Sequence, residues 1–259
     1  MFINNFDPVA FKILTLDIRW YSLAYIFGIT IGWFLCKKIF IQDKELNEKF
    51  DDYITYLIFG IIFGGRLGYV IFYNFDYYIN NLLDIFKIWE GGMSFHGGLI
   101  GIIISSIIFA KKTGDNTFIY MDLVALVAPI GIFFGRIANF MNSELYGIPS
   151  TAPWAVIFIK IDKLGRHPSQ LYEALLEGII LFLILFYINK KNFHKKDGFI
   201  SALFLIFYSI FRFFLEFFRE PDEHLGYIVL NLTMGQIISV LFIIFGIVLF
   251  YFKNENKKY

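Results

Sequence analysis

Charged residues are scarce in this sequence. Only 17% of its 259 residues are Asp, Glu, Lys or Arg, whereas about a quarter of the residues in an ordinary soluble domain are charged. The formal net charge of +1 indicates no nucleic-acid or other polyanionic partner. The remainder is 58% hydrophobic, with a mean hydropathy of +0.62. So much apolar surface cannot all fold inward, which favours the lipid bilayer as the solvent of the chain.

Cysteine is almost absent as well. The single cysteine, Cys36, excludes an internal disulfide and argues against a thiolate metal site. It lies beside Lys37 and Lys38 at the end of an apolar run, where a packing role is expected. No His, Asp or Glu spacing suggests a metal site either. The sequence therefore predicts no metal site.

Long apolar runs are what the sequence has in abundance. A helix needs about 20 apolar residues to cross a hydrocarbon core about 30 Å thick. Seven such runs occur, at residues 19–40, 53–73, 94–110, 119–140, 169–188, 199–218 and 234–252. The first is too long for a cleavable signal peptide and ends in lysines instead of a small-residue cleavage site. The pattern predicts an all-α polytopic membrane protein with about seven transmembrane helices, forming a single domain over residues 1–259.

Basic residues are divided unequally between the two faces of such a seven-span chain. One face has thirteen lysines, namely Lys37, Lys38, Lys44, Lys49, Lys111, Lys112, Lys190, Lys191, Lys195, Lys196, Lys253, Lys257 and Lys258. The other face has seven basic residues, namely Lys12, Arg19, Lys87, Lys160, Lys163, Arg166 and Arg219. Because positive residues are enriched in cytoplasmic loops, we expect the N-terminus outside and the C-terminus in the cytoplasm. The outer loops, at about 74–92, 141–168 and 219–233, are then the only expected place for extramembrane structure of any size.

Three arginines fall inside the apolar runs: Arg66, Arg136 and Arg212. Each costs about 2.5–3.5 kcal/mol near a helix centre on insertion scales, so each needs a partner or a function. In the seven-span arrangement all three lie in the outer half of the membrane. The helices that run inward place their polar residues near the same depth: Tyr21, His96, His167, Gln170, Tyr172 and Glu173. The arrangement predicts a site fed from the outer leaflet.

Structural explanations exist for two of these arginines. Arg212 and Glu216 are four residues apart on one helix face and can form an ion pair. Arg66 is surrounded by Gly64, Gly65 and Gly68, which is typical of a close-packed helix surface. Packing and function are therefore equally expected for Arg66. Function is favoured for the other two arginines because further polar residues surround them.

Two dense motifs stand at the outer ends of the third and fourth runs. Residues 91–101 are rich in glycine around His96, and glycine lets a backbone approach a ligand closely. A lone histidine is usually a packing residue, but its place between glycines at a membrane surface favours a function. Residues 135–147 bring Arg136 and Asn139 onto one helix face, three residues apart.

The second motif resembles the signature of the bacterial prolipoprotein diacylglyceryl transferase family. Further blocks resemble that family in its order along nearly the whole chain: Arg19-Trp20-Tyr21, residues 93–101, 166–173 and 212–222, and Met234-Gly235-Gln236. Two departures are visible. Ala138 stands where glycine is commoner, and the stretch between Gly147 and Arg166 is short for the family, so no elaborate outer head is expected.

The resemblance implies transfer of the diacylglyceryl group of phosphatidylglycerol to the lipobox cysteine thiol of a preprolipoprotein. Glycerol phosphate leaves and a thioether forms. The implied partners are phosphatidylglycerol, signal peptides with a lipobox cysteine, and membrane lipids, with no nucleic acid and no cofactor. The implied location is the bacterial cytoplasmic (inner) membrane, with the active site towards the outer leaflet.

The residue types suit this chemistry. A cysteine thiol is only a few per cent thiolate at pH 7, so a base such as His96 is expected to help. An arginine fork binds a phosphate bidentately, and Arg136 is the first candidate for it. Arg212 and Tyr21 complete the candidate catalytic residues. The candidate substrate-binding residues are Arg136, Asn139, Glu144, Glu216, Gly97 and Arg66.

Two other classes of protein fit part of this pattern. A transporter of organic anions also needs intramembrane arginines, but it is expected to show inverted repeats and broken helices in both halves. A lipid hydrolase with Ser94 as its nucleophile is the second alternative. No G-x-S-x-G elbow surrounds Ser94, so a packing role is favoured for this serine.

Overall fold

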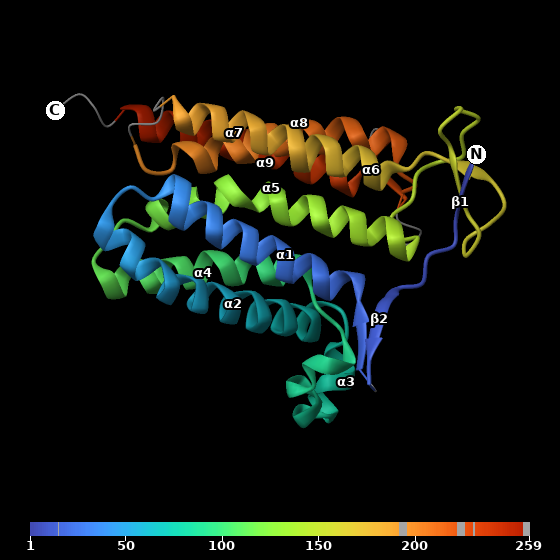
Figure 1. Cartoon of the computed structure of the whole chain (residues 1–259), viewed down its shortest axis with the longest axis horizontal. Helices are drawn as coiled ribbons and strands as arrows, with labels where there is room; N and C mark the ends of the chain where they lie inside the picture. The colour runs from blue at the N-terminus through green and yellow to red at the C-terminus, as the bar shows by residue number, and fades with distance from the viewer. Residues whose placement is uncertain (15, 192–195, 222–225, 230, 256–259) are drawn as a thin grey trace. The chain divides into compact units, whose positions relative to one another are not determined.

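The computed structural model describes residues 1–14, 16–191, 196–221, 226–229 and 231–255 (Figure 1). Asp222 of the 212–222 block and Lys195, Lys257 and Lys258 of the basic face lie outside these ranges. The chain forms two compact units. The larger unit comprises Met1–Cys36 and Asp122–Tyr259, and the smaller unit comprises Lys37–Met121.

The seven apolar runs each form a helix long and apolar enough to cross a membrane, which confirms the predicted fold class within the described residues. The chain is therefore a multi-pass membrane protein. Its spanning elements are α1 (Trp20–Leu35) with a π-helical end (Cys36–Phe40), α2 (Lys44–Phe72), α4 (Phe95–Thr113), α5 (Thr117–Asn142), α6 (Ser169–Glu173) with a π-helical segment (Ala174–Ile180) and α7 (Leu181–Lys190), α8 (Phe199–Leu215) with a 3-10 turn (Glu216–Phe218), and α9 (Met234–Glu255).

The second helix begins earlier than its apolar run predicts. Its N-cap is Asp43, whose side chain accepts a hydrogen bond from the backbone N–H of Leu46 at 2.7 Å. A capping side chain stabilises a first turn even where that turn is polar. The helix therefore starts at Lys44, ahead of the apolar run at residue 53.

Glycines bring α2 and α4 together in the smaller unit. A Cβ added to Gly64 would overlap the carbonyl oxygen of Gly97, and one added to Gly101 would overlap that of Gly60. Small residues at such positions let two helix backbones approach closely, which drives helix association in lipid. Gly97, a predicted substrate-binding residue, is thus part of this helix contact.

A partly buried carboxylate fixes the start of α8 in the larger unit. Asp122 on α5 accepts hydrogen bonds from the backbone N–H groups of Gly198 and Ser201 at 2.7 and 2.8 Å, and from the Ser201 hydroxyl at 2.6 Å. The first N–H groups of a helix have no partner within the helix. Asp122 therefore acts as a cap supplied by another helix.

We expect Asp122→Ala to lower the free energy of unfolding by about 0.5–2 kcal/mol, the usual cost of losing an N-cap. Thermal unfolding of the purified protein in detergent measures this loss. Asp122→Asn is the matched control, because its amide oxygen still accepts from the helix and should retain part of the stability. Equal stability of all three proteins would contradict the capping role.

The chain also forms short β-strands, and three of them precede the first spanning helix. β1 (Phe2–Asn4) pairs with β4 (Val156–Phe158), which also pairs with β5 (Gly165–Arg166). The other pairs are β2 (Val9–Ile13) with β3 (Leu16–Arg19), and β6 (Tyr227–Val229) with β7 (Leu232–Thr233). The strands β4 to β7 lie within the long outer loops at 141–168 and 219–233, whereas the short strands β1 to β3 precede the first spanning helix.

The N-terminal strands have a clear anchor. The Asn4 side-chain amide donates a hydrogen bond to the carbonyl oxygen of Phe140 at 2.7 Å. Asn4 is fully buried, so this bond replaces the water that a polar amide would otherwise need. The contact ties β1 to the end of α5, which is the helix that carries Arg136 and Asn139.

Candidate active site

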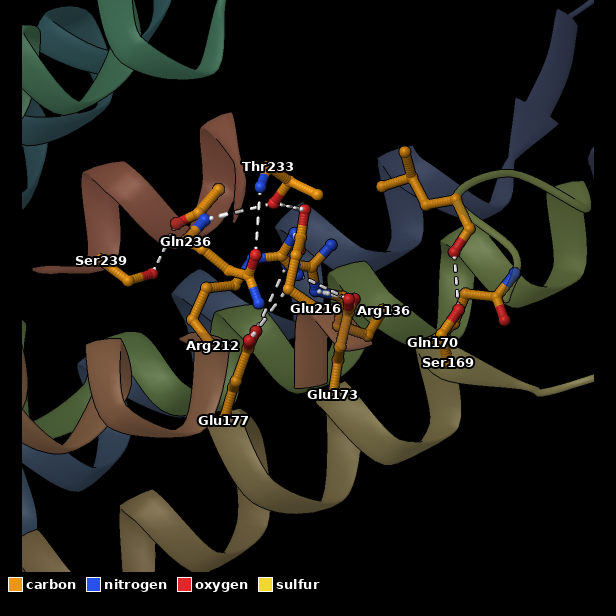
Figure 2. Close-up of polar contacts among 12 residues, drawn as sticks. Arg136, Ser169, Gln170, Glu173, Glu177, Arg212, Glu216, Thr233, Gln236 and Ser239 are labelled. Atoms are coloured by element: carbon orange, nitrogen blue, oxygen red, sulfur yellow. Dashed lines mark hydrogen bonds and ion pairs between the residues drawn. The ribbon is translucent and has the colours of Figure 1, made fainter. Parts of the chain in front are cut away.

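A buried ionic cluster joins three spanning elements of the larger unit (Figure 2). Its centre is Glu173 at the end of α6. One Glu173 oxygen lies 2.9 Å from Nε of Arg136 on α5, and the other lies 2.6 Å from Nη1 of Arg212 on α8. Glu173 is completely buried, and Arg212 is 8% exposed. One carboxylate thus bridges two arginines at the depth of the membrane helices.

Two further glutamates complete this cluster. Glu177, also completely buried, lies 3.3 Å from Nη2 of Arg136 and 3.9 Å from Nη1 of Arg212. Glu216 forms an ion pair with Nη2 of Arg212 and accepts a hydrogen bond from the Thr233 hydroxyl at 2.9 Å. The expected ion pair between Arg212 and Glu216 is therefore present.

Local backbone geometry makes room for these side chains. The segment Ala174–Ile180 is π-helical, and such wide turns are frequent at functional sites. A Cβ added to Gly178 would lie 2.7 Å from Cβ of Phe133 on α5, and one added to Gly235 would lie 2.7 Å from a carboxylate oxygen of Glu216. Glycine at position 178 therefore lets α5 approach closely, and glycine at position 235 leaves room for the Glu216 carboxylate.

Arg136 and Arg212 differ in which of their N–H donors have partners. Arg212 gives both terminal nitrogens to carboxylates. Arginine has five N–H donors, and within the described residues Arg136 uses Nε, towards Glu173, and Nη2, towards Glu177. The pair of donors at the Nη1 end of Arg136 has no partner among those residues. Arg136 is thus the cluster member that still has a free edge for an anion.

A second polar group lies on the same helices. Asn139, one turn after Arg136 on α5, donates through Nδ2 to the hydroxyl of Tyr21, which in turn donates to a carboxylate oxygen of Glu144. The Gln170 amide donates to the carbonyl oxygen of Glu144 at 2.7 Å. Since Gln170 precedes Glu173 by one turn on α6, the Tyr21 group and the ionic cluster share two helices.

The turn that presents Glu144 is held in an uncommon conformation. Ser143 and Leu145 on either side of it have φ of +59° and +53°, a region that L-residues rarely adopt. The Ser169 hydroxyl donates to the carbonyl oxygen of Leu145 at 2.9 Å, which helps to fix the turn. Such strain persists only where surrounding contacts enforce it, and it is concentrated at functional sites.

Arg166 organises the loops next to this turn. Its guanidinium contacts Asp162 at 2.6 Å, Glu220 at 2.8 Å and the carbonyl oxygen of Gly147 at 3.0 Å, and it lies 4.8 Å from the ring centre of Tyr146. Hydrogen bonding to Arg166 holds the pKa of Asp162 below its usual value. Arg166 therefore has a structural role in joining the 141–168 loop to the end of α8.

His96 and Arg66 belong to the smaller unit. His96 lies in the first turn of α4 with an exposed side chain, and no described residue forms a hydrogen bond or ion pair with its imidazole. Ser94 is the N-cap of the same helix and accepts from the Gly97 N–H at 3.2 Å. Arg66 donates to the carbonyl oxygens of four residues of the loop between α2 and α4: Asp84, Ile85, Gly91 and Gly92.

Within the larger unit, the structure brings together most of the predicted site residues: Tyr21, Arg136, Asn139, Glu144, Arg212 and Glu216. Sequence reasoning missed Glu177 and Thr233, and it named Glu173 only as a polar residue at the same depth, not as a candidate site residue. Glu177 carried a readable signal, because a charged residue in an apolar run is a functional candidate by default. Thr233 is an ordinary polar residue before α9, and nothing in the sequence marks it.

Comparison with known proteins gives consistent matches. The family described as prolipoprotein diacylglyceryl transferase matches residues 8–252. A phosphatidylglycerol–prolipoprotein diacylglyceryl transferase of Oleidesulfovibrio alaskensis is 49% identical over 257 residues, covering 98% of this chain and 95% of that protein. Proteins of the same name from Rickettsia bellii and Rickettsia akari are 49% and 50% identical, covering 95% and 93% of this chain and 94% and 95% of the relatives.

Proposed function

The chain belongs to the prolipoprotein diacylglyceryl transferase family, and we propose that its ionic cluster binds the phosphate of phosphatidylglycerol during transfer. The protein is a membrane transferase of lipoprotein biosynthesis that moves the diacylglyceryl group of phosphatidylglycerol to a prolipoprotein. The acceptor is the lipobox cysteine of the signal peptide. The family match covers parts of both compact units, which we treat as one catalytic domain.

The free edge of Arg136 is the observation that carries the phosphate assignment. Glu173 contacts Nε of this guanidinium, and Glu177 contacts Nη2. A phosphate then meets a pair of donors at the Nη1 end, already oriented by two completely buried glutamates. Preorganised donors of this kind stabilise charge that develops in a transition state.

The reaction explains why a donor pair is needed at this point. The cysteine sulfur forms a bond to the terminal glycerol carbon of the diacylglyceryl group, and the bond from that carbon to the phosphate oxygen breaks. The leaving glycerol phosphate takes the electron pair and gains negative charge. The thiol proton passes to a base, which is His96 in our assignment. Sulfur supplies the nucleophile, so the enzyme needs no reactive cysteine of its own.

The remaining residues support this chemistry. Glu216 orients Arg212, which fixes Glu173 and through it Arg136. The chain of hydrogen bonds from Asn139 through Tyr21 to Glu144 positions polar groups one helical turn from the phosphate site. Gly97 and Arg66 contribute to substrate binding through the backbone that they hold in place.

A transfer assay separates this function from its two rivals. Purified protein is incubated with phosphatidylglycerol labelled in its acyl chains and with a lipobox peptide. The transferase produces a labelled peptide and free glycerol phosphate in equal amounts. A hydrolase would release free fatty acid or diacylglycerol without labelling the peptide, and a transporter would release neither. The capping role of Ser94 already disfavours this residue as a nucleophile, because its oxygen accepts from Gly97.

We propose that the protein lies in the cytoplasmic membrane with its C-terminus inside and its active site towards the outer leaflet. The excess of lysines on one face supports this orientation. A reporter enzyme fused after Tyr259 is expected to be active only in the cytoplasm. A tag inserted near Thr151 should be accessible from outside in intact cells or spheroplasts. A C-terminus on the outside would contradict the orientation.

A further inference from the structure

The loop between α2 and α4 is unusually apolar on its exposed side. It contains α3 (Phe75–Asn80) and two 3-10 turns (Leu82–Phe86 and Ile88–Glu90). Leu83 is 80% exposed, Trp89 76% and Phe86 70%. Further exposed apolar residues of this loop are Phe75, Tyr77, Ile79, Leu82 and Ile88. An extramembrane loop in water rarely exposes so large an apolar surface.

This surface continues onto both flanking helices. Phe72 at the end of α2 and Phe95 at the start of α4 are 73% and 72% exposed. These helices are membrane spans, so their exposed apolar side chains face lipid. Tyr77 and Trp89 also belong to the two residue types that concentrate at membrane–water interfaces. The apolar side of the loop therefore extends a surface that already contacts the bilayer.

The polar backbone of the loop is satisfied from within the protein. Arg66 donates to the carbonyl oxygens of Asp84 and Gly91 at 2.6 Å, of Ile85 at 2.8 Å and of Gly92 at 3.2 Å. Its guanidinium also lies 5.2 Å from the ring centre of Tyr78. An irregular backbone is tolerated at membrane depth only where its polar groups find protein partners. One buried arginine supplies four of them.

The charged side chains in the middle of the loop are likewise neutralised. Lys87 contacts Asp84 at 2.6 Å, and the Tyr77 hydroxyl donates to Asp84 at 2.6 Å. Pairing Lys87 with Asp84 and satisfying four carbonyl groups through Arg66 lowers the cost of moving the middle of this loop out of water.

We propose that the 75–93 segment is a membrane-interface element, in which Leu83, Phe86 and Trp89 insert among the acyl chains of the leaflet. The hydrogen bonds of Arg66 to four carbonyl oxygens let this irregular segment lie there. The partner of the surface is the lipid bilayer itself, and the inference does not depend on the proposed transfer chemistry. Because the segment lies immediately before α4, it also fixes the depth at which that helix begins, with His96 in its first turn.

Site-specific fluorescence in lipid vesicles tests this placement. The only cysteine, Cys36, is completely buried, so Cys36→Ala gives a background for single-cysteine labelling. An environment-sensitive dye is attached in turn to Leu83→Cys, to Phe86→Cys and to the control Thr151→Cys, an exposed position in the 141–168 loop. The dyes at 83 and 86 should show blue-shifted emission and strong quenching by doxyl-labelled lipid. The dye at 151 should be quenched by aqueous iodide instead.

Substitution of Arg66 tests separately whether its hydrogen bonds hold the segment in the membrane. Arg66→Gln removes the guanidinium, so the dye at 83 should shift towards the emission seen in water and lose several-fold of its quenching by lipid. The dye at 151 should not change. Iodide quenching at 83 and 86 in the otherwise native protein would overturn the membrane placement. Protection from both quenchers would also overturn it, because a protein surface would then cover the segment.

Discussion

Arg136→Lys is expected to lower kcat/KM for diacylglyceryl transfer by about 10²–10³-fold, the usual loss when one preorganised donor to a developing anion is removed. Lysine retains the positive charge, so Glu173 and Glu177 are not left as unpaired buried carboxylates. It has no planar fork, however, and its three N–H donors cannot contact both glutamates and also give a phosphate two parallel hydrogen bonds. The variant should therefore insert and fold while losing most of its activity.

The measurement is initial-rate transfer from labelled phosphatidylglycerol to a lipobox peptide, with purified variants compared at equal folded concentration. Arg66→Lys is the matched control, because it makes the same change in an arginine that bonds to backbone carbonyl groups. Its loss should be clearly smaller. Near-normal activity of Arg136→Lys would contradict the assignment of Arg136 as the phosphate-binding residue, but it would not affect the family membership.

The sequence was sufficient to predict the spanning helices. Each is marked by a run of apolar residues, and this signal is local, so the third helix appears at Phe95–Thr113 although its run was the shortest. The short strands carry no such signal. β1 has three residues and pairs with a strand more than 150 positions later. Its pairing is set by long-range contacts such as that of Asn4 with Phe140, which no local pattern records.

The candidate site was likewise predicted only in part: local patterns indicated some of its residues, but not the contacts between distant helices. Arg136, Arg212 and Glu216 were predicted because charged residues in an apolar run need partners, and the spacing of the last two allowed one pair to be named. The spacing gave no indication that Glu173 bridges both arginines, because they lie on α5 and α8, far apart in sequence. The π-helical turn that carries Glu177 was also not predicted, because no local sequence pattern marks a π-helix, and the close approach of Gly178 to Phe133 on α5 is a long-range contact.

A role of His96 as general base predicts a specific pH dependence. His96→Gln keeps a polar side chain of similar size but removes the proton acceptor. General-base catalysis contributes about 10²–10⁴-fold, so the transfer rate near neutral pH should fall within that range. Phosphatidylglycerol binding should survive, because the substitution leaves the ionic cluster of the larger unit unchanged. A lipid-binding titration of the variant checks this second expectation.

The pH–rate profile decides between a base and a purely structural histidine. A cysteine thiol has a pKa of about 8.5, so a rising pH supplies thiolate without help from the enzyme. If His96 removes the thiol proton, the defect of His96→Gln should shrink steadily as the pH approaches that value. If the exposed imidazole instead binds the lipid head group, the defect should be constant with pH and appear as a weaker affinity for phosphatidylglycerol. The same two measurements on Ser94→Ala, which removes the cap of α4 but retains the imidazole, should give a defect that does not vary with pH.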